Sequence, residues 1–228
     1  MKLLSFLSFA ALATLAPVVA SAQSPIAGLY VTGVDILGNR LGAGLVDPHW
    51  KIVGPTGGLL NAVVVNNSGG TCRLANTWLA PSGQACWIWQ NANGTPVGSV
   101  STPLTLRFRT TFDLTGFDHT TAFIGGTWAT DNTGLNVYIN GVATGNTIPG
   151  VLTSNFGTTK AFAINNGFQA GVNTLDFDVS DAGSVGGFLV QSIDGHAMAS
   201  SVVPEPSTYA LMGAGLLALG VVARRRRI

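Results

Sequence analysis

The sequence predicts an all-β protein, an antiparallel β-sandwich, enclosed between two short apolar ends. Three observations carry this prediction: polar and apolar residues alternate along residues 23–200, turn signals recur at close intervals, and no part of that range has a helical period. The 228-residue chain is 46% hydrophobic and only 9% charged. This is too apolar for an ordinary soluble domain, and the excess lies in the two ends.

The N-terminal end has the features of a secretory signal peptide over residues 1–22. Lys2 precedes an apolar stretch at 3–19, and the small residues up to Ala22 fit the pattern that a signal peptidase accepts. Cleavage after Ala22 would leave Gln23 as the first residue. A retained membrane anchor is the alternative, which is disfavoured because the apolar run ends just before a good cleavage site.

The body, residues 23–200, contains several segments with the period of half-buried strands. The clearest is 104–114, followed by 135–139 and 175–179. Weaker segments are 60–65, 86–90, 122–128, 162–164 and 188–193. Turn residues such as Asn140-Gly141 separate them. We therefore expect two packed antiparallel sheets.

Part of this body resembles a known fold family. Residues 107–114, then 128–141 with its Asn-Gly hairpin, then 168–177 with a Gly-x-Asn turn, resemble the galactose-binding-like jelly roll. The resemblance covers under half of the chain. It implies a jelly-roll arrangement of the β-sandwich and implies no reaction.

The C-terminal end combines a linker, an apolar segment and a basic tail. Two prolines in the linker, 201–206, forbid a helix before the apolar segment 207–223, which we expect to form one transmembrane helix. At 1.5 Å per residue this helix is about 25 Å long, near the lower limit for crossing a bilayer. Under the positive-inside rule the tail, 224–228, stays cytoplasmic. The residues that define these features are Pro204, Glu205 and Pro206 in the linker and Arg224, Arg225, Arg226 and Arg227 in the tail.

The Pro-Glu-Pro triplet, the short apolar span and the terminal arginines, in this order, resemble the PEP-CTERM sorting signal of Gram-negative bacteria. The resemblance implies that an exosortase, a membrane cysteine protease, recognises the tail and passes the protein outward. The implied route runs through an intermediate anchored in the inner membrane to the cell surface or the extracellular matrix. From the spacing alone, a simple C-terminal membrane anchor is the alternative.

The two cysteines, Cys72 and Cys86, lie in the part of the chain that would be exported, where oxidation is permitted. We expect them to form a disulfide. A free catalytic thiol is the alternative, but it needs a base and a depressed pKa, and no neighbouring residue in the sequence supplies them.

Charge and motif content exclude several classes of function. Between the two ends there are six basic and nine acidic residues with no basic patch, so nucleic-acid binding is not expected. The three histidines are too far apart for a short zinc motif, and Gly-x-Ser-x-Gly is absent. Asp176 and Asp178 share one strand face and could serve as paired carboxylates of a glycosidase, but a solvated strand face is the more usual meaning of this pattern.

Two groups of residues could bind a ligand. Trp87, Trp89 and Trp128 could stack on sugar rings, although large aromatics more often fill a core. Asp131 and Asn132 could offer oxygens to a structural calcium ion, as in similar jelly rolls, although both residues are also common in turns.

The sequence thus predicts an exported protein without a cofactor, apart from a structural calcium ion, and without enzymatic activity. We expect a structural or adhesive role with exopolysaccharide. A carbohydrate-binding module is the first alternative, and a secreted hydrolase is the second. Signal peptidase, an exosortase, the inner membrane and a polysaccharide are the expected partners.

Overall fold

Eleven strands and one helix make up the part of the chain that the computed structural model describes, which is residues 22–66, 71–97, 103–150, 155–183, 185–200 and 206–226. The strands are β1 (Gln23–Pro25), β2 (Val46–Val53), β3 (Leu59–Val64), β4 (Ile88–Trp89), β5 (Leu104–Asp113), β6 (Phe117–Asp131), β7 (Thr133–Ile139), β8 (Val142–Ala143), β9 (Lys160–Ile164), β10 (Val172–Asp181) and β11 (Gly187–Ala199). The helix is α1 (Pro206–Arg225).

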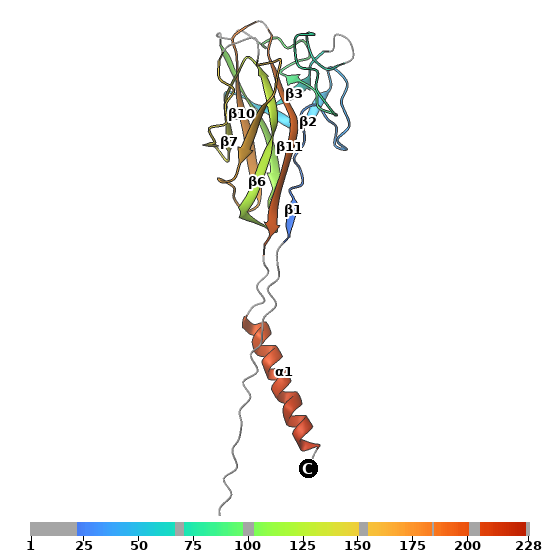
Figure 1. The fold of residues 1–228 in the computed structure, drawn as a ribbon, viewed down its shortest axis with the longest axis vertical. Helices are drawn as coiled ribbons and strands as arrows, with labels where there is room; N and C mark the ends of the chain where they lie inside the picture. Colours follow the sequence, from blue (N-terminus) through green and yellow to red (C-terminus); the bar gives the residue numbers. More distant parts are fainter. Residues whose placement is uncertain are drawn as a thin grey trace, which may run out of the picture.

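The strands pair in antiparallel fashion in the order β8-β7-β10-β5-β2-β3-β4-β11-β6-β9. The short strand β1 pairs with β11 and lies beside it in Figure 1. This long sheet folds over so that β5 and β10 face β6 and β11. Ring contacts mark the closure: Phe177 of β10 lies 5.1 Å from Trp128 of β6 and 5.2 Å from Phe188 of β11, between ring centroids. The prediction of an all-β protein with antiparallel, sandwich-like packing is confirmed, but the two layers belong to one continuous sheet and not to the two separate sheets that we expected.

Aromatic side chains fill the space between the two layers. Five of them are fully buried and contact one another in edge-on or stacked arrangements: Trp50, Phe108, Trp128, Phe177 and Phe188. Each comes from the inward-facing positions of a strand, because alternate residues of a strand point to one face. Aromatic rings of this size bury a large apolar area per residue, and this cluster therefore contributes strongly to hydrophobic stabilisation.

The three segments with the clearest alternation in the sequence correspond to β5, β7 and β10. The weaker predicted segments lie in or overlap β3, β4, β6, β9 and β11. The Asn140-Gly141 turn joins β7 to β8, with Ile139 paired to Val142. Both turn residues have positive φ, 50° and 81°. This is the backbone that a two-residue hairpin of type I′ requires, and Asn-Gly adopts it most readily.

Sequence alternation missed β2, because its ladder is interrupted between Val46 and Lys51. The buried side chain of Asp47 accepts hydrogen bonds from the backbone N–H groups of Gly33, His49 and Trp50. These bonds hold the irregular backbone in place. Burial nevertheless outweighs them and raises the pKa of Asp47.

The C-terminal helix α1 corrects one prediction. Among the described residues, no helix is both long and apolar enough to cross a membrane, so a transmembrane helix over 207–223 is not supported. Three glycines interrupt the apolar side chains of α1, and Arg224 and Arg225 already belong to its last turn. The helix also begins one residue earlier than expected, at Pro206, because proline is tolerated in the first turn.

Candidate functional site

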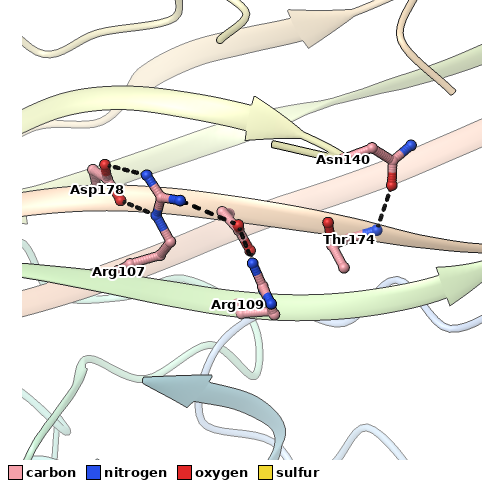
Figure 2. Close-up of polar contacts among 6 residues, drawn as sticks. Arg107, Arg109, Asn140, Thr174 and Asp178 are labelled. Atoms are coloured by element: carbon pink, nitrogen blue, oxygen red, sulfur yellow. Dashed lines mark hydrogen bonds and ion pairs between the residues drawn. The ribbon is translucent and has the colours of Figure 1, made fainter. Parts of the chain in front are cut away.

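The outer face of β5 and β10 carries a ladder of ion pairs. Arg109 donates from Nε and Nη2 to the two carboxylate oxygens of Asp176, both at 2.7 Å. Arg107 donates in the same way to Asp178, at 2.6 and 2.7 Å (Figure 2). The strand register places each arginine directly opposite its aspartate. The guanidinium plane matches a carboxylate in this two-bond geometry, which gives the strongest kind of charge-assisted pair.

Tyr138 of β7 completes this group, because the guanidinium carbon of Arg107 lies 4.5 Å from the centre of its ring. We call Arg107, Arg109, Tyr138, Asp176 and Asp178 the charged ladder. Hydrogen bonding to the aspartates raises the pKa of both arginines, although desolvation opposes it. Nη1 of Arg107 also lies 3.9 Å from Asp176, so the four charges form one connected network.

The hairpin next to the charged ladder is tied to β10 by side-chain amides. Oδ1 of Asn140 accepts a hydrogen bond from the backbone N–H of Thr174 at 2.9 Å (Figure 2). Its Nδ2 donates to Asn173 at 2.7 Å. These bonds fix β7 against β10 and keep Tyr138 beside Arg107.

The expectation of a solvated strand face at Asp176 and Asp178 was wrong, because both residues are buried. The side chain of Asp176 is fully buried and that of Asp178 is 12% exposed, whereas the arginine side chains above them are about one third exposed, at 29% and 33%. Each carboxylate accepts two hydrogen bonds from a guanidinium, so neither is placed as a free general acid or base. The signal that sequence reasoning missed was the equal spacing of Arg107 and Arg109 on one strand and of the two aspartates on another.

The tryptophans proposed as sugar-stacking residues are in the core instead. Trp87, Trp89 and Trp128 are all 0% exposed. The backbone of a glycine packs directly against each of these rings: Gly186 against Trp89, Gly187 against Trp87 and Gly134 against Trp128. An added Cβ at these glycines would fall within 3 Å of a ring atom, so the close approach requires glycine. These side chains cannot form a binding platform in this structure.

Cys72 and Cys86 form a disulfide, as predicted. Both residues are buried beside Trp87, and Cys72 accepts a backbone hydrogen bond from the Trp87 N–H at its carbonyl. The cross-link holds the loop before β4 against the core. In the chain-entropy model, a disulfide that closes a loop of this length stabilises the folded state by on the order of 3 kcal/mol.

The predicted calcium residues, Asp131 and Asn132, bond to each other. Nδ2 of Asn132 donates to Oδ1 of Asp131, and Oδ1 of Asn132 accepts from the backbone N–H of Ala182 at 2.7 Å. Burial, together with the negative charge of Asp181, raises the pKa of Asp131 to about 7. Within the described ranges, no group of three or more His, Cys, Asp or Glu side chains could hold a metal ion.

An apolar pocket of about 720 Å³ opens beside β2, β3 and the start of β5. In this region β2 pairs with β5 only along residues 107–109, so the start of β5 at 104–106 has no paired residue on β2. Polar rim residues of the pocket already have partners within the protein: Asn61 accepts from Lys51, and Gln90 accepts from the backbone N–H of Val97. The lining of this pocket is therefore mainly apolar, and the side-chain oxygens of Asn61 and Gln90 on its rim are already occupied.

The two ends of the body meet at one pole. Gln23 of β1 pairs with Met198 of β11, close to the point where β11 leads into the C-terminal segment.

The predicted signal peptide lies outside the described residues except for Ala22. Pro204, Glu205 and Arg227 of the predicted signal also lie outside them, whereas Pro206 opens α1 and Arg224, Arg225 and Arg226 lie at its end.

This C-terminal segment is a known signal. Residues 202–227 match the PEP-CTERM protein-sorting motif. The motif covers the predicted triplet, the apolar segment and all four arginines, and it indicates export sorted by an exosortase. No curated protein and no solved structure matches the chain. The sorting motif is therefore the part with a recognised role, and the charged ladder is the most developed polar site of the described body.

Proposed function

We propose that this chain is a non-enzymatic protein of the cell surface or extracellular matrix, with a structural or adhesive role alongside exopolysaccharide. The single observation that carries the proposal is the PEP-CTERM sorting motif at residues 202–227. On the proposed route, signal peptidase cuts after Ala22, and an exosortase then acts on the tail at the inner membrane. The body that remains is a β-sandwich, for which we propose a jelly-roll arrangement of the galactose-binding-like kind.

The sorting step can be tested by replacing Pro204, Glu205 and Pro206 with alanine. We expect the variant to keep its C-terminal tail and to remain in the cell envelope, which mass spectrometry of the C-terminus and cell fractionation would show. Pro55→Ala, in an exposed turn of the body, is the matched control and should be processed normally. Normal processing and delivery of the triplet variant would contradict sorting by this motif.

A carbohydrate-binding module is the second candidate, and the charged ladder favours it. Its two arginine side chains are held by the aspartates and are about one third exposed, and the guanidinium of Arg107 lies against the ring of Tyr138. Planar polar groups next to an aromatic ring suit a sugar ring with hydroxyl or carboxylate substituents. Because the tryptophans are buried, the outer face of β5, β7 and β10 replaces them as the proposed contact surface.

Binding of the exported chain to a panel of neutral and acidic glycans separates these candidates. If the charged ladder binds a glycan, Arg107→Ala should weaken binding at least tenfold. Lys160→Ala, at an exposed position of β9, should leave binding unchanged. Retention of no glycan would remove the module and leave the structural role. A secreted hydrolase remains the last alternative, and release of reducing ends from any of these glycans would favour it over both binding roles.

A further inference from the structure

The first residue after the predicted signal peptidase site is a glutamine at the very start of β1. Gln23 is exposed and pairs with Met198 of β11. Its side chain makes no hydrogen bond to the described residues. The chemistry of this residue changes once the leader is removed, because its backbone nitrogen then becomes a free amine.

The hydrogen-bond pattern of β1 shows which way that nitrogen points. The backbone N–H of Ile26 donates to the carbonyl of Gly195 at 2.9 Å, so Ile26 faces β11. In an antiparallel pair, successive residues direct their N–H and C=O groups alternately toward and away from the partner strand. Ser24 therefore also faces β11, whereas Pro25 and Gln23 face away from it.

Two further observations agree with this alternation of directions along β1. Pro25 has no N–H and occupies a position where the ladder needs none. On the partner strand, the backbone N–H of Met198 donates to Oγ1 of Thr121 at 2.9 Å rather than to β1. No described strand lies on the other side of β1. The nitrogen of Gln23 thus points away from β11, and no ladder hydrogen bond between described strands depends on it.

We propose that Gln23 is a modification site, at which the mature N-terminus closes to pyroglutamate. The α-amine attacks Cδ of the residue's own side-chain amide, a C–N bond forms, and the bond from Cδ to Nε2 breaks. Nε2 leaves as ammonia and takes up the proton that the amine loses. The step needs no oxidant, reductant or second substrate, and it rests on the leader cleavage of the proposed function.

The fold accommodates the ring that results. Pyroglutamate has the five-membered ring of proline, and proline is accepted at the first residue of a strand. The product has no N-terminal positive charge and no free amine for an aminopeptidase to bind. The start of β1 lies beside the end of β11, and cyclisation would protect it outside the cell.

Mass spectrometry of the N-terminal peptide of the exported full-length protein tests the proposal. We expect a peptide that begins at residue 23 and is lighter than the unmodified sequence by one ammonia molecule. Pyroglutamyl peptidase should remove the N-terminal pyroglutamyl residue from this peptide, and an ordinary aminopeptidase should not. Gln23→Ala is the matched control: it should keep a free amine, become aminopeptidase-sensitive and unfold at the same denaturant concentration, because the ladder is unchanged.

Gln23→Glu gives a second measure, since it can close only by losing water and should do so more slowly. A peptide that begins at Gln23 but keeps its free amine after prolonged incubation at neutral pH would overturn the modification and leave the leader cleavage intact. A peptide that begins at any other residue would overturn both the cleavage site and the modification. The same spectrum therefore distinguishes the two failures.

Discussion

The two faces of β10 are both covered, but by opposite kinds of side chain. On the inner face Phe177 is fully buried among the rings of Trp50, Trp128, Phe162 and Phe188. On the outer face Asp176 is equally buried, beneath the guanidinium groups of the neighbouring strand. One strand therefore combines an aromatic core with an ionic layer one residue away.

The two faces of β10 should contribute differently to the stability of the sandwich. Burial of a ring removes apolar area from water and gives a net gain. Burial of a carboxylate costs free energy, which two charge-assisted hydrogen bonds then offset. The inner face should therefore supply stability, and the outer face should be close to neutral while its pairs are complete. Breaking a pair on the outer face should nevertheless cost free energy, because it leaves a buried charge behind.

Phe177→Ala tests the inner face and should have the largest effect. Loss of a ring from a filled core costs about 3–5 kcal/mol, from lost transfer energy and from the cavity left behind. We expect a large fall in the urea midpoint with little change in the slope. Val172→Ala, at an exposed position of the same strand, is the matched control and should change stability by less than about 0.5 kcal/mol. Similar shifts for the two variants would contradict the assignment of the core.

Arg109→Met tests the outer face and should have the second largest effect. Methionine keeps much of the stem but leaves Asp176 with only Arg107, whose Nη1 is 3.9 Å away. We expect a loss of about 2 kcal/mol in urea unfolding, below the 3–5 kcal/mol of a fully broken buried pair, because this partner remains.

The double variant Arg109→Met with Asp176→Leu should recover most of that loss, because an apolar replacement of both partners leaves no unpaired charge. Lys160→Met, at an exposed residue of β9, controls for removal of a positive charge alone and should be neutral. If the double variant were less stable than Arg109→Met, the ion pairs would contribute net stability rather than balance a burial cost.

The same contrast explains what sequence could predict. Alternation identified β5, β7 and β10, because it depends only on which side chains face the core. It could not show that Asp176 is buried, since that depends on the register that places Arg109 opposite it. The three tryptophans were ambiguous for a related reason. A strand pattern does not show that Gly134, Gly186 and Gly187 bring backbone onto their rings. The sorting motif was predictable because it is a linear signal and needs no tertiary contact.

Two buried carboxylates, those of Asp176 and Asp131, differ in whether a cationic side chain lies beside them. Asp176 has two arginines nearby, whereas Asp131 lies near Asp181, whose Oδ2 is buried and has no hydrogen-bond partner in the described chain. Burial first, and then the charge of Asp181, raises the pKa of Asp131 to about 7, against about 3.9 in an unfolded chain. The native state therefore holds the proton more tightly, and this group should reduce stability as the pH rises from about 4 to about 7.

Asp131→Asn removes the ionisation but keeps the size of the side chain and an oxygen that can accept from Asn132. We expect the variant to melt about 2–4 °C above the unsubstituted protein at pH 8, the shift for about 1 kcal/mol in a domain of this size, and at the same temperature near pH 4. Asp113→Asn is the control of opposite sign, because hydrogen bonds from Thr115 lower the pKa of Asp113, and this variant should not gain stability at pH 8. Melting curves of all three proteins from pH 4 to pH 8 provide the measurement. A constant difference between Asp131→Asn and the unsubstituted protein across this range would show that Asp131 does not titrate there. Asp131 and Asp176 would then differ in their neighbours but not in their charge.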